Sequence, residues 1–102
     1  MRNFRTYDLA VAFYHSSQRL KLKSTLREQL NRAAASIPLN LAEGRAKPTV
    51  KDQIRFFYIA LGSVRECQAI LELANLRNHF TYKELDIVGA ALYCLIRNAR
   101  SP

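Results

Sequence analysis

Residues 25–44 read TLREQLNRAAASIPLNLAEG, and their spacing decides which fold the chain can adopt. Apolar residues recur every three or four positions, which places them on one face of an α-helix. This inner stripe comprises Leu26, Leu30, Ala33, Ile37 and Leu41. Thr25 and Glu28 have the spacing of a capping box, in which each side chain satisfies a backbone donor of the first turn. We therefore expect an amphipathic helix over residues 25–43 that must bury one face against other elements.

Two residues within this stretch are expected to shape the helix. Pro38 removes one backbone hydrogen bond and crowds the carbonyl of Ala34, so we expect a bend or local unwinding at this point. Gly44 can adopt the left-handed conformation that follows the last turn of many helices. We therefore expect the helix to stop there.

Three further segments show helical periodicity, over residues 7–20, 49–76 and 82–97. Thr81 and Glu84 repeat the capping-box spacing ahead of the last segment. Three Gly and three Pro among 102 residues are few for a turn-rich β architecture. Because short connections favour antiparallel neighbours, we predict an all-α fold in which residues 1–102 form a single antiparallel up-down-up-down four-helix bundle.

Positive charge dominates the chain, since sixteen Lys and Arg against eight Asp and Glu give a net charge of +8 at pH 7. An excess of this size suggests an anionic partner such as RNA or DNA. The predicted topology gathers cations at the end that holds both termini and the 45–48 connection. The candidate nucleic-acid contacts at this end are Arg2, Arg5, Arg45, Lys47, Lys51, Arg55, Arg97 and Arg100, and Arg32 on the helix over 25–43 is a further candidate.

Residues 56–64, FFYIALGSV, carry no charge through two and a half helical turns. A helix on the outside of a monomeric bundle should show a polar face. Two interpretations remain open: a wide core-facing stripe with a few surface aromatics, or a subunit interface of a homo-oligomer. The candidate interface residues are Leu39, Phe56, Tyr58, Ile59 and Ser63.

The usual catalytic and metal-binding signatures are absent from the sequence. It has no Gly-rich phosphate loop, no His-Glu-x-x-His zinc signature, no Cys-x-x-Cys pair and no Gly-x-Ser-x-Gly nucleophile elbow. We therefore expect no enzymatic activity, no metal and no cofactor. Cys67 and Cys94 each fall in an apolar helical pattern and are expected to be buried, reduced thiols. No charge-free run approaches the roughly 18 residues that span a bilayer, so we expect a cytoplasmic protein without a membrane partner.

Two stretches carry a pattern that goes beyond helical periodicity. They are residues 29–44, QLNRAAASIPLNLAEG, and residues 56–63, FFYIALGS, followed by Glu66 and by LELA at 71–74. Together they resemble the signature of the four-helix-bundle family named for the 23S ribosomal RNA intervening-sequence protein. The resemblance implies a four-helix bundle, self-assembly into a ring that is typically a pentamer, and no known enzymatic activity. Asn31 departs from the pattern, because family members often carry Arg there.

Relatives in that family include the accessory proteins of diversity-generating retroelements, which form basic pentamers that bind nucleic acid and a reverse transcriptase. The resemblance therefore implies a homo-oligomer with RNA or DNA as its partner. A second hypothesis is a structural or adaptor module that binds a protein partner through the apolar face of the helix over 49–76. In that case the positive charge serves mainly solubility.

Overall fold

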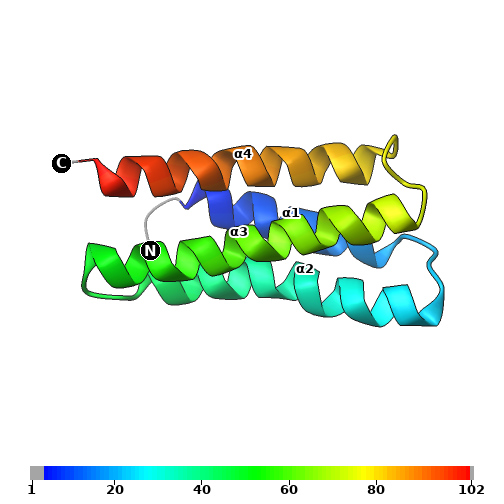
Figure 1. Ribbon diagram of the computed structural model, residues 1–102, viewed down its shortest axis with the longest axis horizontal. Coiled ribbons are helices and arrows are strands. Elements are labelled where there is room, and N and C mark those ends of the chain that lie inside the picture. Colours follow the sequence, from blue (N-terminus) through cyan, green and yellow to red (C-terminus); the bar gives the residue numbers. More distant parts are fainter. Residues whose placement is uncertain (1–3, 102) are drawn as a thin grey trace.

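The computed structural model of the protein describes residues 4–101, and Figure 1 shows four helices joined by short connections. The helices are α1 (Arg5–Gln18), α2 (Ser24–Arg45), α3 (Val50–Leu73) and α4 (Phe80–Arg100). No strand occurs within residues 4–101, so the all-α prediction is confirmed. None of the four helices is both long and apolar enough to cross a lipid bilayer.

The four helices surround one apolar core. α1 packs against α2 and α4, and α3 packs against the same two helices, so each helix has two neighbours. Figure 1 shows the α1–α2 and α3–α4 connections at one end of the molecule, and the α2–α3 connection with the end of α4 at the other. Every helix contributes side chains whose burial is worth about 1.5–3 kcal/mol each. The largest fully enclosed apolar ones include Phe13, Leu30, Ile37, Leu41, Leu71, Leu85 and Leu92.

The predicted helix bounds agree with the observed ones to within three residues, and the largest differences have local causes. α3 ends at Leu73 because Asn75 adopts a left-handed conformation with φ of 60°. The backbone N–H of Leu76 then bonds to the carbonyl of Leu71 at 2.9 Å, and that of Asn75 to Glu72 at 3.0 Å. This pair of bonds is the Schellman termination, which the sequence-based boundary at residue 76 missed.

Both capping boxes predicted from spacing are wrong. α4 begins at Phe80, two residues before the predicted start, because His79 Nδ1 accepts a hydrogen bond from the Thr81 backbone N–H at 3.1 Å. Thr81 therefore lies inside the first turn, where it is buried. α2 begins at Ser24 without a side-chain cap, so Thr25 is already helical. In both cases a start one or two residues earlier moves the Thr out of the capping position.

The start of α3 follows its sequence pattern closely. Thr49 is the N-cap, and its Oγ1 accepts a hydrogen bond from the Asp52 backbone N–H at 3.2 Å. Asp52 also places a negative charge in the first turn, where the helix dipole favours it. This start fixes where the α2–α3 connection enters the bundle.

α2 stays helical at both positions where local unwinding or a stop was expected. Pro38 and Gly44 lie inside the helix, which ends at Arg45 with Ala46 as its C-cap. No glycine within residues 4–101 has a positive φ, so Gly44 is not the left-handed stop that was expected. A Cβ built on Gly44 would lie 2.8 Å from Phe57 Cε1. The missing side chain therefore lets α3 approach α2 closely at this level.

A hydrogen-bonded pair of serines joins α2 to α3 further along. Ser63 Oγ donates a hydrogen bond to Ser36 Oγ at 2.8 Å, and Asn40 Nδ2 donates to the same Ser36 hydroxyl at 2.9 Å. Ser63 is only 9% exposed. It lies between two helices of one chain, where its hydroxyl already has a partner. Its place at a subunit interface stays a prediction.

Arg27 closes the corner between α1 and α2. Its guanidinium donates to the carbonyl of Ser17 at 3.0 Å and also to the carbonyl of Leu20. Asn31 Oδ1 accepts hydrogen bonds from Arg27 at 3.1 Å and from Gln18 Nε2 at 3.0 Å. These bonds tie the start of α2 to the end of α1 and to the connection that follows it. Asn31 therefore helps to hold the corner between α1 and α2 together, at a position where family members often carry Arg.

The charge-free stretch of α3 is partly buried inside the bundle. Phe57, Ala60 and Val64 are at most 3% exposed, whereas Tyr58 and Ile59 are 47% and 43% exposed. A core-facing stripe therefore accounts for part of this stretch. Tyr58 and Ile59 are the large side chains that it leaves available for other contacts.

The two cysteines have different environments, which corrects the prediction that both are buried. Cys67 is fully buried on α3, and this burial, with a smaller effect from the Glu66 carboxylate, raises the pKa of its thiol to about 12. Cys94 lies exposed on α4, and both thiols are free. Cys94 falls on the outer face of α4 because the buried Leu92 and Ile96 lie one turn apart on the opposite face of the helix.

Gly44→Ala should lower the free energy of unfolding by about 1–3 kcal/mol, because its methyl group overpacks against the buried Phe57. Gly62 is the matched control, since it is also helical and an added Cβ would have no atom within 4 Å other than its chain neighbours and the backbone of its own helix. Gly62→Ala should raise the free energy of unfolding by about 0.5–1 kcal/mol, because alanine favours the helix. Urea unfolding followed by circular dichroism measures both. A stabilised Gly44→Ala protein would contradict the close approach of α2 and α3.

Alkylation should distinguish the two thiols. Iodoacetamide at neutral pH is expected to add one label to the native protein, at Cys94, because burial and a raised pKa keep Cys67 an inaccessible protonated thiol. Denaturation before labelling should give two labels, counted by intact-mass spectrometry. Rapid native labelling of Cys67 would show that α3 is not packed as described.

Candidate nucleic-acid interface

Seven of the predicted nucleic-acid contacts meet at one end of the bundle, which we call the basic end. They come from the start of α1, the α2–α3 connection with its flanking turns, and the end of α4, which lie together on the left in Figure 1. These residues are Arg5, Arg45, Lys47, Lys51, Arg55, Arg97 and Arg100. Arg32 lies exposed midway along α2, apart from this end. Arg2 falls outside the described residues.

The basic end contains a cleft of about 460 Å³ to which all four helices or their caps contribute. The guanidinium carbon of Arg45 lies 4.5 Å from the centre of the Phe4 ring, a cation–π distance. Arg5, Gln53 and Asn98 supply further polar groups to the lining. The cleft therefore combines two guanidinium groups with neutral side chains of the kind that bind phosphate oxygens.

Two cations of the basic end lie against one aromatic ring. Lys47 Nζ is 5.1 Å and Arg55 Cζ is 4.4 Å from the centre of the Phe56 ring. Each also has a carboxylate nearby, since Lys47 Nζ lies 3.1 Å from Glu43 and Arg55 Nε lies 4.0 Å from Asp52. These two cations are thus partly neutralised. Phe56, half-buried beside them, belongs to the basic end more than to an open apolar surface.

The remaining cations of the basic end carry its unbalanced charge. Within residues 4–101 none of them forms an ion pair with a carboxylate; they are Arg5, Arg45, Lys51, Arg97 and Arg100. The described part of this end holds seven cations and three acidic residues, which leaves a net charge of +4. Unbalanced surface charge of this kind raises the local concentration of anionic partners.

A smaller cleft of about 230 Å³ lies between α3 and α4 and adjoins the basic end; we call it the α3–α4 cleft. It is lined by Tyr58, Leu61 and Arg65 from α3 and by Tyr93, Ile96, Arg97 and Arg100 from α4. Arg65 and Tyr93 were missed as site residues by sequence reasoning. The spacing of the residues was the available signal. The lining residues of α3 recur at three- or four-residue intervals, as do those of α4, so each set shares one face of its helix. A single sequence does not reveal that the two faces meet.

Two candidate interface residues lie exposed near the groove between α2 and α3. Leu39 is 68% exposed and Ile59 is 43% exposed. The serine hydrogen bond and the Gly44 contact set the register of these helices, and this register brings Leu39 level with the turn that carries Ile59. Tyr58 lies about 100° further round α3, where its hydroxyl accepts a hydrogen bond from Arg100 on α4 at 3.1 Å. Tyr58 and Ile59 therefore face different neighbours.

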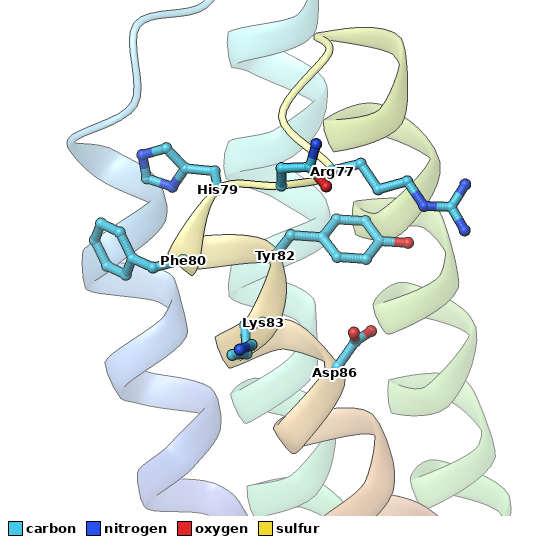
Figure 2. A pocket seen from close by; sticks show the side chains of 7 residues that line it. Arg77, His79, Phe80, Tyr82, Lys83 and Asp86 are labelled. Carbon is cyan, nitrogen blue, oxygen red and sulfur yellow. The ribbon is translucent and has the colours of Figure 1, made fainter.

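The opposite end has a wider cleft of about 640 Å³ around the α3–α4 connection. Figure 2 shows Arg77 and Tyr82 pointing to one side of this connection, and His79 and Phe80 pointing to the other. The Tyr82 hydroxyl donates a hydrogen bond to the Glu72 carboxylate at 2.6 Å, and this bond raises the pKa of Tyr82. The lining groups do not converge on one point. No group of His, Cys, Asp or Glu suited to holding a metal occurs among the residues described.

The sequence of this bundle matches a protein-family model over residues 4–97, from the cap of α1 into the last turns of α4. That family is described as 23S rRNA-intervening sequence protein. The chain belongs to this family. The resemblance carried by the two motif stretches is thereby confirmed. A comparison with curated proteins finds no match to the chain.

In this member of the 23S rRNA-intervening sequence protein family, the two motif stretches form the contact between α2 and α3. Residues 29–44 lie in α2 and residues 56–63 lie in α3. They hold the hydrogen-bonded pair Ser36 and Ser63, and the glycine against which the Phe57 ring packs. The seven cations of the basic end all lie outside these stretches. The motif therefore accounts for the packing of α2 against α3. The cations that could bind a partner lie elsewhere on the surface.

Proposed function

We propose that this chain is a non-enzymatic, homo-oligomeric protein that binds RNA or DNA through its basic end, on an antiparallel up-down-up-down bundle. One observation carries the proposal: five cations at this end have no carboxylate partner within residues 4–101. Folding gathers them from three separate segments of the chain. A surface of this kind binds the phosphate backbone and releases its condensed counterions.

The kind of cation also supports a phosphate ligand. Five of the seven cations at the basic end are arginines. The guanidinium group presents a planar fork of donors that matches two phosphate oxygens, whereas a lysine ammonium acts as a point charge. Neutral donors in the same cleft, from Gln53 and Asn98, fit the side-chain contacts that position a nucleic-acid backbone.

Self-assembly is the second part of the proposal. Leu39 and Ile59 are exposed apolar side chains at the same level of α2 and α3, a pair that we call the apolar strip. Burial between subunits would remove both from water. The family resemblance implies a ring, typically a pentamer. A ring would present several basic ends together, so that one nucleic acid contacting two of them gains affinity through a high effective concentration.

The same strip supports one alternative function. Leu39 and Ile59 are exposed apolar residues near the rim of one groove, which suits docking of a protein partner. The chain would then be an adaptor without a nucleic-acid role, and its positive charge would serve solubility. If the chain binds nucleic acid, removing cations of the basic end should weaken that binding. If it is an adaptor, removing them should leave binding of its protein partner unchanged.

Binding to labelled duplex DNA should weaken steeply as salt rises. If about five phosphates are neutralised per bound unit, a plot of log K against log salt should have a slope near −4.5. The triple variant R5Q/R45Q/K51Q removes three unpaired cations from the basic end and should make the slope shallower by about 2.7. Fluorescence anisotropy over a series of salt concentrations measures both slopes.

The matched control is R19Q/K21Q/K23Q, which removes three exposed cations from the opposite end. It has the same net charge as the first triple variant and should keep the wild-type slope. Equal losses in the two variants would show that net charge alone drives binding. Absence of binding to both RNA and DNA at low salt would leave the adaptor function in its place.

Light scattering at several protein concentrations tests the assembly. The wild-type protein should have a mass several times the 11.7 kDa of one chain. Ile59→Asp should reduce that mass to the monomer, because a carboxylate would be desolvated in the contact. Ile87→Asp is the control, since Ile87 is similarly exposed but lies on α4, and it should remain assembled. A wild-type protein that is monomeric throughout would contradict self-assembly.

A further inference from the structure

The α3–α4 cleft shares Arg97 and Arg100 with the basic end, but phosphate binding by the basic end does not account for its apolar and aromatic lining. Its floor is apolar, formed by the half-buried Leu61 and by Ile96, which is 4% exposed. Tyr58 and Tyr93 stand on its two sides, one from each helix. The helices thus form a short slot with an apolar base and aromatic walls.

Three guanidinium groups line this slot, and they belong to Arg65, Arg97 and Arg100. None of them forms an ion pair with a carboxylate within residues 4–101. Arg100 donates a hydrogen bond to the Tyr58 hydroxyl at 3.1 Å, which is a neutral acceptor and leaves the charge uncompensated. No Asp or Glu lines the slot. Its electrostatics therefore suit an anionic ligand.

The two tyrosines suit a planar ligand. Tyr58 is 47% exposed and Tyr93 is 61% exposed, so both rings offer surface to a binding partner. Proteins that bind single-stranded nucleic acids stack unpaired bases on aromatic rings of this kind and hold the adjacent phosphates with arginine. In a duplex the bases are paired and stacked inside, so their faces do not reach such rings.

The size of the slot limits what it can hold. Its volume of about 230 Å³ lies below the roughly 300–1,000 Å³ of ordinary small-molecule pockets, so it takes a single flat group rather than an extended ligand. We propose that the α3–α4 cleft binds one unpaired nucleotide of a single-stranded RNA or DNA, with the base against Tyr93 and its phosphates on Arg65, Arg97 and Arg100. This inference rests on the proposed nucleic-acid function and names its substrate class.

The residues around the slot also indicate the direction in which a bound strand runs. The groove between α3 and α4 continues away from the basic end into a second hollow that includes Arg65, Gln68 and Asp86. Gln68 Nε2 donates a hydrogen bond to Asp86 Oδ1 at 3.0 Å, which holds a carboxylate at that side. A carboxylate repels phosphate, whereas Arg97 and Arg100 lead toward the basic end. The bound strand therefore runs from the level of Arg65 toward the basic end.

The first test compares a labelled single-stranded oligonucleotide with the same strand annealed to its complement. Tyr93→Ala should weaken binding of the single strand by about tenfold or more through lost base stacking, while duplex binding stays unchanged. Tyr93→Phe keeps the ring and should bind the single strand like the wild type. Phe80→Ala removes an equally exposed ring at the opposite end and should change neither affinity.

The outcomes separate this inference from the proposed function. Single-strand binding by Tyr93→Ala within about twofold of the wild type would overturn the slot while leaving nucleic-acid binding by the basic end intact. Equal losses for the single strand and the duplex would overturn it too, because the ring would then not act on an unpaired base. A wild-type protein that binds neither nucleic acid would remove the proposed function itself.

Fluorine NMR gives a direct second readout. The chain has five tyrosines, so 3-fluorotyrosine labelling gives five resonances that single Tyr→Phe substitutions assign. A short single-stranded oligonucleotide should shift the resonances of Tyr58 and Tyr93 and leave those of Tyr14 and Tyr82 in place. Saturated binding that moves neither Tyr58 nor Tyr93 would exclude the slot as the site.

Discussion

The close approach of α2 and α3 at Gly44 sets the geometry of the rest of the molecule. Because Gly44 has no side chain, the Phe57 ring packs directly against the backbone of α2. Together with the Ser36–Ser63 hydrogen bond, this contact fixes how far α3 is shifted along α2 and how it is rotated. The rotation turns Ile59 toward the α2 side and Arg65 toward α4. Which side of α3 faces α2, and which side faces α4, follows from this one packing constraint.

The net charge of +8 is a poor guide to the site, because it does not show which cations already have carboxylate partners. Some cations of the basic end are balanced locally, as Lys47 is by Glu43 and Arg55 is by Asp52. Others meet only because chain segments far apart in sequence end at the same place. Where the cations lie, and which of them have carboxylate partners, is what makes one end of the bundle suited to phosphate.

Local patterns and packing disagreed mainly at helix termini. The Thr25 and Thr81 capping boxes had the correct spacing, yet both helices begin earlier, and His79 caps α4 instead. Gly44 looked like a stop signal and proved to be a packing position inside a helix. Capping bonds are worth about 1 kcal/mol, so burial of a helix face readily overrides them. Helix interiors were predictable because many apolar positions support the same periodicity.

The sequence by itself determined that the chain is all-α, which face of each helix is apolar, where the cations lie along the chain, and the family to which it belongs. The tertiary structure decided that Ser63 packs inside the protomer, that Cys94 is exposed, and that Arg65 and Tyr93 share a cleft with Arg97. Periodicity fixes directions around one helix axis. Which faces meet depends on the rotation and shift between two helices, and only their packed side chains set those.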